Sequence, residues 1–180
     1  MKHAPAVIKG LVLRRTNTGE TDRILTLLTK EKGKVVCVAK GVRKLTSSTR
    51  AFLEPGMLVK VNLIETRSLP LLTQAVLIDD TSKMIQNLQN YSQLSQILEI
   101  FDTLFVEAEI DHTTFLSAIQ LRNQVIYNQS SPKHIRQLLS DLIIALGFQD
   151  PATSPYDSIT DYLESLTGKP LNSFAFLRVQ

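Results

Sequence analysis

The chain has 180 residues, of which 43% are apolar, and it carries a formal net charge of +3. This length and apolar content allow one substantial domain or two small ones, and they exclude disorder of the whole chain. The longest apolar runs, at 35–39 and 142–146, fall far short of the roughly 18 residues that a membrane-spanning helix needs. With one cysteine and no evident signal peptide, we expect a cytoplasmic protein that has no internal disulfide and no membrane partner.

The charge is divided unevenly along the chain. Residues 1–80 contain 14 Lys and Arg against 7 Asp and Glu, whereas residues 81–180 contain 6 against 10. A basic half of this kind is typical of a domain that binds a polyanion. A solvated basic face with no partner explains the same charge equally well.

The first half of the chain is predicted to form strands. Short apolar stretches rich in β-branched residues alternate there with turn residues. The predicted strands cover 6–15, 23–29, 34–40, 58–64 and 71–78. In the fourth strand, alternation directs Val59, Val61 and Leu63 inward and the residues between them outward. The gap at 41–56 leaves room for a basic loop and a short helical turn, a layout that suits a five-stranded OB barrel.

The apolar spacing becomes helical after residue 80. The predicted helices cover 85–108, 115–126, 132–146 and 159–166. Pro132 suits the first turn of the third helix, and Gly147 closes it. The predicted fold class is therefore α+β: an OB-fold barrel over residues 1–80 and a helical domain over 81–180.

No pattern of residues nominates a catalytic centre. The glycines form no phosphate-binding loop, and the three histidines lack metal-ligand spacing. Cys37 lies in an apolar stretch, where a free cysteine behaves as a core residue. Asp79 and Asp80 are adjacent, as in some metal-dependent nucleases, but neighbours on a strand point to opposite faces. We expect a protein that is not an enzyme and binds no cofactor or metal.

The segment from Gly10 to Lys44 carries a specific motif. It reads G-x-V-L, then E-x-D-x-I and a Thr, then a Gly-Lys strand and an A-K-G-x-R loop. In this order of motifs it resembles the N-terminal domain of the RecO family of bacterial recombination mediators. The matching residues are Gly10, Val12, Leu13, Glu20, Asp22, Ile24, Thr29, Gly33, Lys34, Ala39, Lys40, Gly41 and Arg43. The resemblance continues through LEPGMLVKVNL and RSLPLLTQAVLID to the third helix and the C-terminal helix.

Two departures from the family are visible. Many members carry a four-cysteine zinc module before the final helix, whereas the corresponding interval, 149–158, contains no cysteine and is too short to hold one. Members often have a basic pair after Gly-Lys-Pro-Leu, where this chain reads NSFAF at 172–176. The chain therefore resembles a short form of RecO without the zinc module, and at 172–176 it lacks the basic pair through which family members make contacts.

The resemblance implies a non-enzymatic protein of recombinational DNA repair that associates with the nucleoid during repair. It would bind single- and double-stranded DNA and anneal complementary strands. With RecR it would help to load RecA, an indirect partner, onto DNA covered by single-strand-binding protein. The alternative is another OB-fold module, such as one that binds structured RNA in translation.

The expected DNA surface is basic and poor in aromatic residues. Residues 1–80 contain a single aromatic residue, Phe52, so attachment is expected through phosphates rather than through stacked bases. Because OB domains commonly bind across strands 2 and 3 and the flanking loops, the candidates lie there. They are Arg14, Arg15, Arg23, Lys34, Lys40, Arg43, Lys44, Arg50 and Arg67.

The resemblance also implies that the helical half is a partner-binding domain that binds the acidic, apolar-ended tail of single-strand-binding protein. Arg122, Lys133 and Arg136 are the predicted cationic rim beside an apolar stripe on the third helix. The ordinary alternative is that these three side chains only keep the helical domain soluble.

Overall fold

The structure is a computed structural model, and it describes residues 6–81, 88–127 and 131–173. The chain forms two compact units. The barrel unit contains Met1–Ser82 together with Phe105–Ile110, and the helical unit contains Lys83–Leu104 together with Asp111–Gln180. The prediction of one boundary after residue 80 was therefore wrong for the six residues 105–110, which lie with the barrel.

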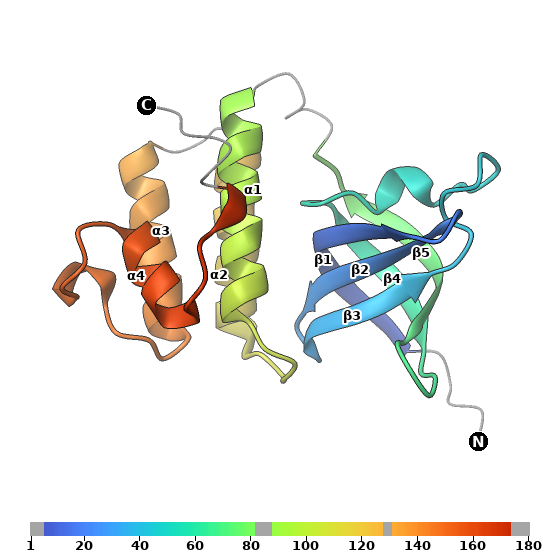
Figure 1. Ribbon diagram of the computed structural model, residues 1–180, viewed down its shortest axis with the longest axis horizontal. Coiled ribbons are helices and arrows are strands. Elements are labelled where there is room, and N and C mark those ends of the chain that lie inside the picture. The colour runs from blue at the N-terminus through green and yellow to red at the C-terminus, as the bar shows by residue number, and fades with distance from the viewer. Residues whose placement is uncertain (1–5, 82–87, 128–130, 174–180) are drawn as a thin grey trace. The chain divides into compact units, whose positions relative to one another are not determined.

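Five strands close the barrel in the order β1-β2-β3-β5-β4, and Figure 1 labels each of them. The strands are β1 (Ala6–Thr18), β2 (Asp22–Thr29), β3 (Gly33–Ala39), β4 (Leu58–Ile64) and β5 (Leu71–Asp79). Neighbouring strands are antiparallel except β3 and β5, which pair in parallel at Val38–Leu71 and Ala39–Leu72. A short 3₁₀ turn, η1 (Arg50–Phe52), lies between β3 and β4. This is the predicted OB-type barrel, so the predicted fold class is confirmed.

Alternation of side chains builds the interior of the barrel. Val59, Val61 and Leu63 of β4 are at most 1% exposed, as the period of two predicts. Cys37 of β3 lies in the same core, where burial raises the pKa of its thiol to about 12. The thiol is therefore protonated at neutral pH and serves as a packing group.

A bulge in β1 changes which of its side chains face inward. The pairing with β2 shifts between Val12 and Arg14, so that Arg15 lies opposite Leu25, a core residue. Directly paired residues share a face of the sheet. Arg15 therefore points toward the interior side of the barrel, at the end where η1 lies against the core through Phe52.

In residues 88–127 and 131–173 the helical unit has four α-helices (Figure 1). They are α1 (Leu88–Leu104), α2 (His112–Ile126), α3 (Pro132–Ala145) and α4 (Ile159–Thr167). Asp111, Ser131 and Ser158 cap the starts of α2, α3 and α4 through side-chain oxygens that accept backbone N–H groups. The four helices confirm the helical prediction, although the predicted start of the first one at 85 lies outside the described residues.

The first predicted helix extended too far at its C-terminal end. Helical spacing carried it to Ala108, but α1 ends at Leu104 and the chain then runs along the barrel. Within the described ranges, no helix is both long enough and apolar enough to cross a bilayer.

Candidate nucleic-acid interface and helical groove

The basic loop that follows β3 is held against the turn between β1 and β2. The Asp22 carboxylate accepts a hydrogen bond from Gly41 N–H at 2.7 Å. Arg43 N–H donates to the Thr21 carbonyl at 2.8 Å, and its guanidinium donates to the Gly19 carbonyl at 3.1 Å. Three contacts thus fix the start of a loop whose sequence gives no regular element.

Each of these contacts involves a motif residue, Asp22, Gly41 or Arg43, and the local backbone and charges explain them. Gly19 and Gly41 have φ of +53° and +66°, a backbone conformation that favours glycine. The hydrogen bond from Gly41 is the largest cause that lowers the pKa of Asp22, and the nearby charges of Lys40 and Lys44 lower it further. Asp22 is therefore ionised at neutral pH, and its carboxylate holds the start of the basic loop at Gly41.

The loop presents cations to solvent. Lys40, Lys44 and Arg50 are exposed, and Arg43 is half-buried. We define these four residues as the loop cations. Arg67, also exposed, lies on the connection between β4 and β5, which meets β3 where Val38 N–H donates to the Pro70 carbonyl at 2.9 Å. Arg14 is exposed on the outer side of β1.

Two of the predicted DNA-binding arginines close one end of the barrel instead. Arg23 is 4% exposed and donates to Glu54 Oε1 at 3.1 Å, while Arg15 Nε donates to Glu54 Oε2 at 2.5 Å. Arg23 also donates to Asn17 Oδ1 and to the Arg50 carbonyl, each at 3.4 Å. Burial lowers the pKa of Arg23, the charge of Arg15 adds to this, and Glu54 opposes both. Glu54 thus stabilises a buried guanidinium, and we remove Arg23 from the candidate DNA surface.

Strand periodicity contained the signal that identifies Arg23 as structural. It lies two residues before Leu25 and four before Leu27, and both of those side chains are in the core. A period of two therefore directs Arg23 inward. Arg15 follows a bulge, which shifts its face, and the bulge itself has no signature in the sequence.

Lys34 occupies a site of mixed charge. Its side chain is half-buried beside a cavity of about 510 Å³, which Lys32, Glu107 and Glu109 also line. Lys34 N–H donates to the Val106 carbonyl at 2.9 Å, and Ile110 N–H donates to the Lys30 carbonyl at 3.1 Å. The Gly-Lys pair of the motif thus positions residues 105–110 along the hairpin of β2 and β3. The carboxylates of Glu107 and Glu109 beside Lys34 would repel a DNA phosphate at this site.

Two observations on the described residues concern base stacking and metal binding. Phe52 is partly buried against the barrel core, and residues 6–81 contain no other aromatic side chain. Among residues 6–81, 88–127 and 131–173, no group of three or more His, Cys, Asp or Glu side chains is placed to hold a metal ion. The chemistry that the barrel surface offers is positive charge on an ordered loop.

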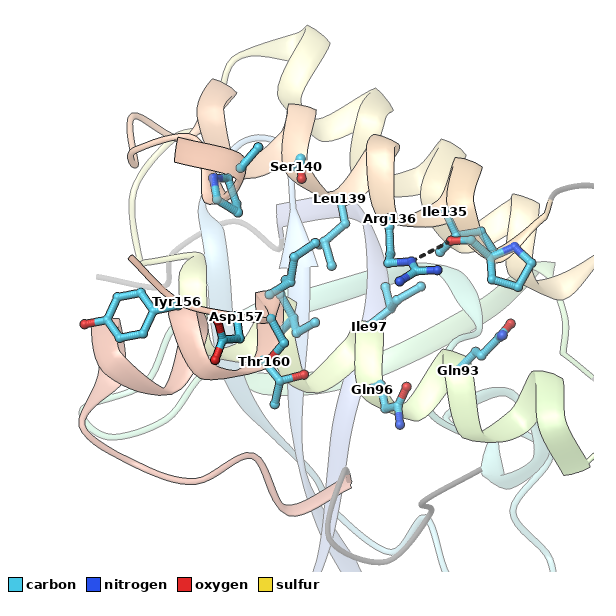
Figure 2. Close-up of a pocket in the computed structure, with 16 residues that line it drawn as sticks. Gln93, Gln96, Ile97, Ile135, Arg136, Leu139, Ser140, Tyr156, Asp157 and Thr160 are labelled. Carbon is cyan, nitrogen blue, oxygen red and sulfur yellow. Dashed lines mark hydrogen bonds between the residues drawn. The ribbon is translucent and has the colours of Figure 1, made fainter. Parts of the chain in front are cut away.

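A groove in the helical unit lies between α1, α3 and residues 151–160. It has a volume of about 610 Å³, and its apolar wall includes Ile97 of α1 and Ile135 and Leu139 of α3. Figure 2 shows Arg136 projecting from α3 over this wall. Its Nε donates to the carbonyl of Pro132, one turn earlier in the same helix, at 3.4 Å. The groove therefore combines an apolar floor with one guanidinium at its rim.

The predicted cationic rim needs a correction. Arg122 of α2 is fully buried, and its guanidinium donates to Asn123 Oδ1 at 2.8 Å. It does not line the groove, and neither does Lys133, which is exposed near the start of α3. Of the three predicted residues, the structure brings only Arg136 to the groove.

Comparisons with known proteins concern the first half of the chain. Residues 1–81 match the family model described as "Recombination protein O N terminal". Proteins named DNA repair protein RecO are 40% identical over 96 residues in Heliobacterium modesticaldum, 41% over 100 in a Nocardioides species and 44% over 97 in Bifidobacterium adolescentis. These matches cover 53%, 55% and 53% of this chain, but only 35%, 41% and 39% of the relatives. The resemblance of the C-terminal helices stays a prediction, and through residues 1–81 the chain is similar to the N-terminal domain of the RecO family.

Proposed function

We propose that the chain is a DNA-binding recombination mediator that acts in DNA repair without catalysing a reaction. The observation that carries this proposal is the ordered basic loop of a RecO-type barrel, in which Asp22 binds Gly41 and leaves Lys40 and Lys44 exposed. The names of the relatives, DNA repair proteins, support the same role. The chain would work in the cytoplasm, where it meets the nucleoid.

Binding would occur mainly through the phosphate backbone. Lys and Arg side chains neutralise phosphates without reading the sequence, because phosphates are the same at every nucleotide. A surface that does not stack the bases leaves their pairing edges available to a second strand. The chain would therefore bind single- and double-stranded DNA and promote annealing of complementary strands.

Its partners are proposed with the same role. We propose that the chain acts with RecR to help RecA load onto DNA covered by single-strand-binding protein. The helical groove supports one of these contacts. The apolar end of that protein's tail would lie against Ile135 and Leu139, and a tail carboxylate would pair with Arg136.

The test is annealing of two complementary DNA strands that are first coated with single-strand-binding protein. The proposed function predicts faster annealing when the chain is added and no change in the length of the strands. Annealing at the uncatalysed rate would contradict the proposal, and divalent-dependent cleavage would replace it with a nuclease. Competition by RNA tests the alternative, an OB-fold module that binds RNA. If the chain were such a module, unlabelled RNA would displace labelled single-stranded DNA more effectively than unlabelled DNA does at the same salt concentration.

A further inference from the structure

The outer face of β4 and its two neighbours carries a second basic surface. The register places Lys9 of β1 opposite Lys60 of β4, and Lys60 opposite Val76 of β5. The next outward row contains Val7, Asn62 and Gln74, again paired across the three strands. We call these six residues the β1-β4-β5 face.

The face is open to solvent and contains no acidic residue. Lys9, Lys60 and Gln74 are exposed, and Val7 and Val76 are 54% and 61% exposed. Among the described residues, neither lysine has a carboxylate partner. Asn62 Nδ2 donates to Gln74 Oε1 at 2.8 Å, so the polar residues beside the lysines are neutral amides.

Two lysines directly opposite each other disfavour the folded barrel. Like charges in a cross-strand pair repel, since the Cβ atoms of such a pair lie about 5 Å apart. Lysines often protect the free edge of a sheet, but β4 is paired on both sides and has no edge to protect. A bound anion between the two ammonium groups would relieve this repulsion.

This surface is separate from the loop cations. In the closed order β1-β2-β3-β5-β4, the neighbours of β4 are β1 and β5, so β2 and β3 lie across the barrel from it. The basic loop leaves the end of β3 and is attached to the turn between β1 and β2. A strand held by that loop leaves the β1-β4-β5 face unoccupied.

We propose that the β1-β4-β5 face binds the phosphate backbone of a second DNA strand, with Lys9 and Lys60 as its phosphate contacts. The exposed valines offer apolar surface to sugars, and the Asn62–Gln74 pair offers an amide donor from Gln74. One barrel then holds two strands at once. This raises their effective concentration toward each other, which is what annealing requires. The inference deepens the proposed function and rests on it.

The test uses the full chain and a labelled oligothymidylate short enough to occupy one surface, roughly eight nucleotides by the site sizes of OB folds. The native chain should bind two oligonucleotides. Lys9→Glu/Lys60→Glu should bind one, as should Lys40→Glu/Lys44→Glu, which alters the other surface. Lys133→Glu/Lys169→Glu removes equal charge from exposed positions of the helical unit and should still bind two.

Annealing supplies the second readout. Charge reversal at Lys9 and Lys60 should slow annealing by about tenfold, because electrostatic steering changes association rates by at least that factor. Lys9→Gln/Lys60→Gln covers the case in which the two glutamates prevent folding, and it should also lose one oligonucleotide. Circular dichroism of each variant checks that the barrel is folded.

The outcomes separate the two proposals. Unchanged stoichiometry and annealing in a folded Lys9/Lys60 variant would overturn this inference and leave the proposed function standing. A native chain that binds two oligonucleotides, loses one in that variant and yet does not anneal would overturn the proposed function alone. A third outcome concerns vesicles that contain an anionic phospholipid. If the native chain binds them and the Lys9/Lys60 variant loses that binding while its DNA binding is unchanged, the face binds lipid headgroups and the inference is overturned.

Discussion

The barrel unit and the helical unit use their charged residues differently. In the barrel, the Asp22 carboxylate binds the backbone of the basic loop at Gly41. The Glu54 carboxylate binds the guanidinium groups of Arg15 and Arg23. The cations that remain, such as Lys40 and Lys44, are exposed. In the helical unit, Arg122 is buried and Arg136 lies at the groove rim. The contrast teaches that carboxylates order the basic surface of the barrel, whereas the groove depends on apolar contact and one guanidinium.

The largest expected effect tests the assignment of residues 105–110 to the barrel. A Cβ at Gly33 would lie 2.1 Å from the Ala108 carbonyl oxygen, and Gly33 has φ of +59°. We expect Gly33→Ala to destabilise the barrel by about 3 kcal/mol or more, because backbone must move as well as adopt a strained conformation. Chemical denaturation measures the loss.

Gly19→Ala is the matched control for this variant. Gly19 has a similar φ of +53°, but a Cβ there would meet no atom within 4 Å. It should cost only about 1–2 kcal/mol, the strain of a left-handed non-glycine residue. Equal losses in the two variants would show that the contact with residues 106–108 contributes nothing.

The next effect tests whether Glu54 closes the end of the barrel. Glu54→Ala leaves Arg23 buried without its carboxylate, so we expect a loss of about 2–3 kcal/mol. Glu65→Ala is the control, because it removes an exposed ion pair with Lys32 and should cost less than about 1 kcal/mol. Thermal or chemical unfolding that gives the same small change for both variants would mean that Arg23 does not need Glu54.

A smaller effect concerns the helical groove. Titration of a fluorescent peptide with the acidic, apolar-ended tail sequence should give about tenfold weaker binding to Arg136→Ala, as expected for the loss of one charge-assisted contact. Lys133→Ala is the control, because Lys133 lies one turn from Arg136 and outside the groove. It should change the affinity less than twofold. Equal affinities for native chain and Arg136→Ala would remove Arg136 from the site.

The smallest effect is a pH dependence at Glu99 in α1. Burial raises the pKa of Glu99, but hydrogen bonds donated by Ser173 and Asn172 lower it overall. A lowered folded pKa gives stability that is present above the ordinary carboxyl pKa and is lost as pH falls through the lowered value.

Hydrogen exchange detects this directly. The amides of Asn172 and Ser173 should lose protection when the pH is lowered below the ordinary Glu pKa of 4.5. Glu99→Gln should abolish that pH dependence, and Asp141→Asn, on exposed α3 surface, should preserve it. Protection that does not change with pH in the native chain would exclude Glu99 as the group responsible.

Periodicity predicted most of the fold because it reports burial directly. The strand at 58–64 and the helices at 115–126 and 132–146 correspond to β4, α2 and α3 within a few residues. Residues 105–110 were missed because their apolar residues continue the helical spacing of α1, whereas the segment forms neither helix nor strand and bonds to the barrel through backbone groups. Their partner Gly33 was visible only as a motif residue, and the close approach that requires it involves residues distant in sequence.

The candidate site was predicted less completely. The basic loop at 40–50 was found from its charge, but its attachment to Asp22 depends on a tertiary contact that charge does not indicate. Arg23 and Arg122 were chosen because they are cationic, whereas their burial follows from the face on which each lies. The β1-β4-β5 face needed the register between three strands, which only the fold provides.

The most direct test of the central claim is the salt dependence of single-stranded DNA binding. If about five phosphates are neutralised, the logarithm of the association constant should fall with the logarithm of salt concentration at a slope of roughly −3 to −4. Lys40→Glu/Lys44→Glu, with both exposed loop lysines reversed, should bind at least about tenfold more weakly and reduce the slope by about 1.4, since each phosphate contributes about 0.7. Lys133→Glu/Lys169→Glu should keep both the affinity and the slope of the native chain. A folded loop variant with unchanged affinity and slope would contradict the claim that the ordered basic loop contacts the DNA backbone.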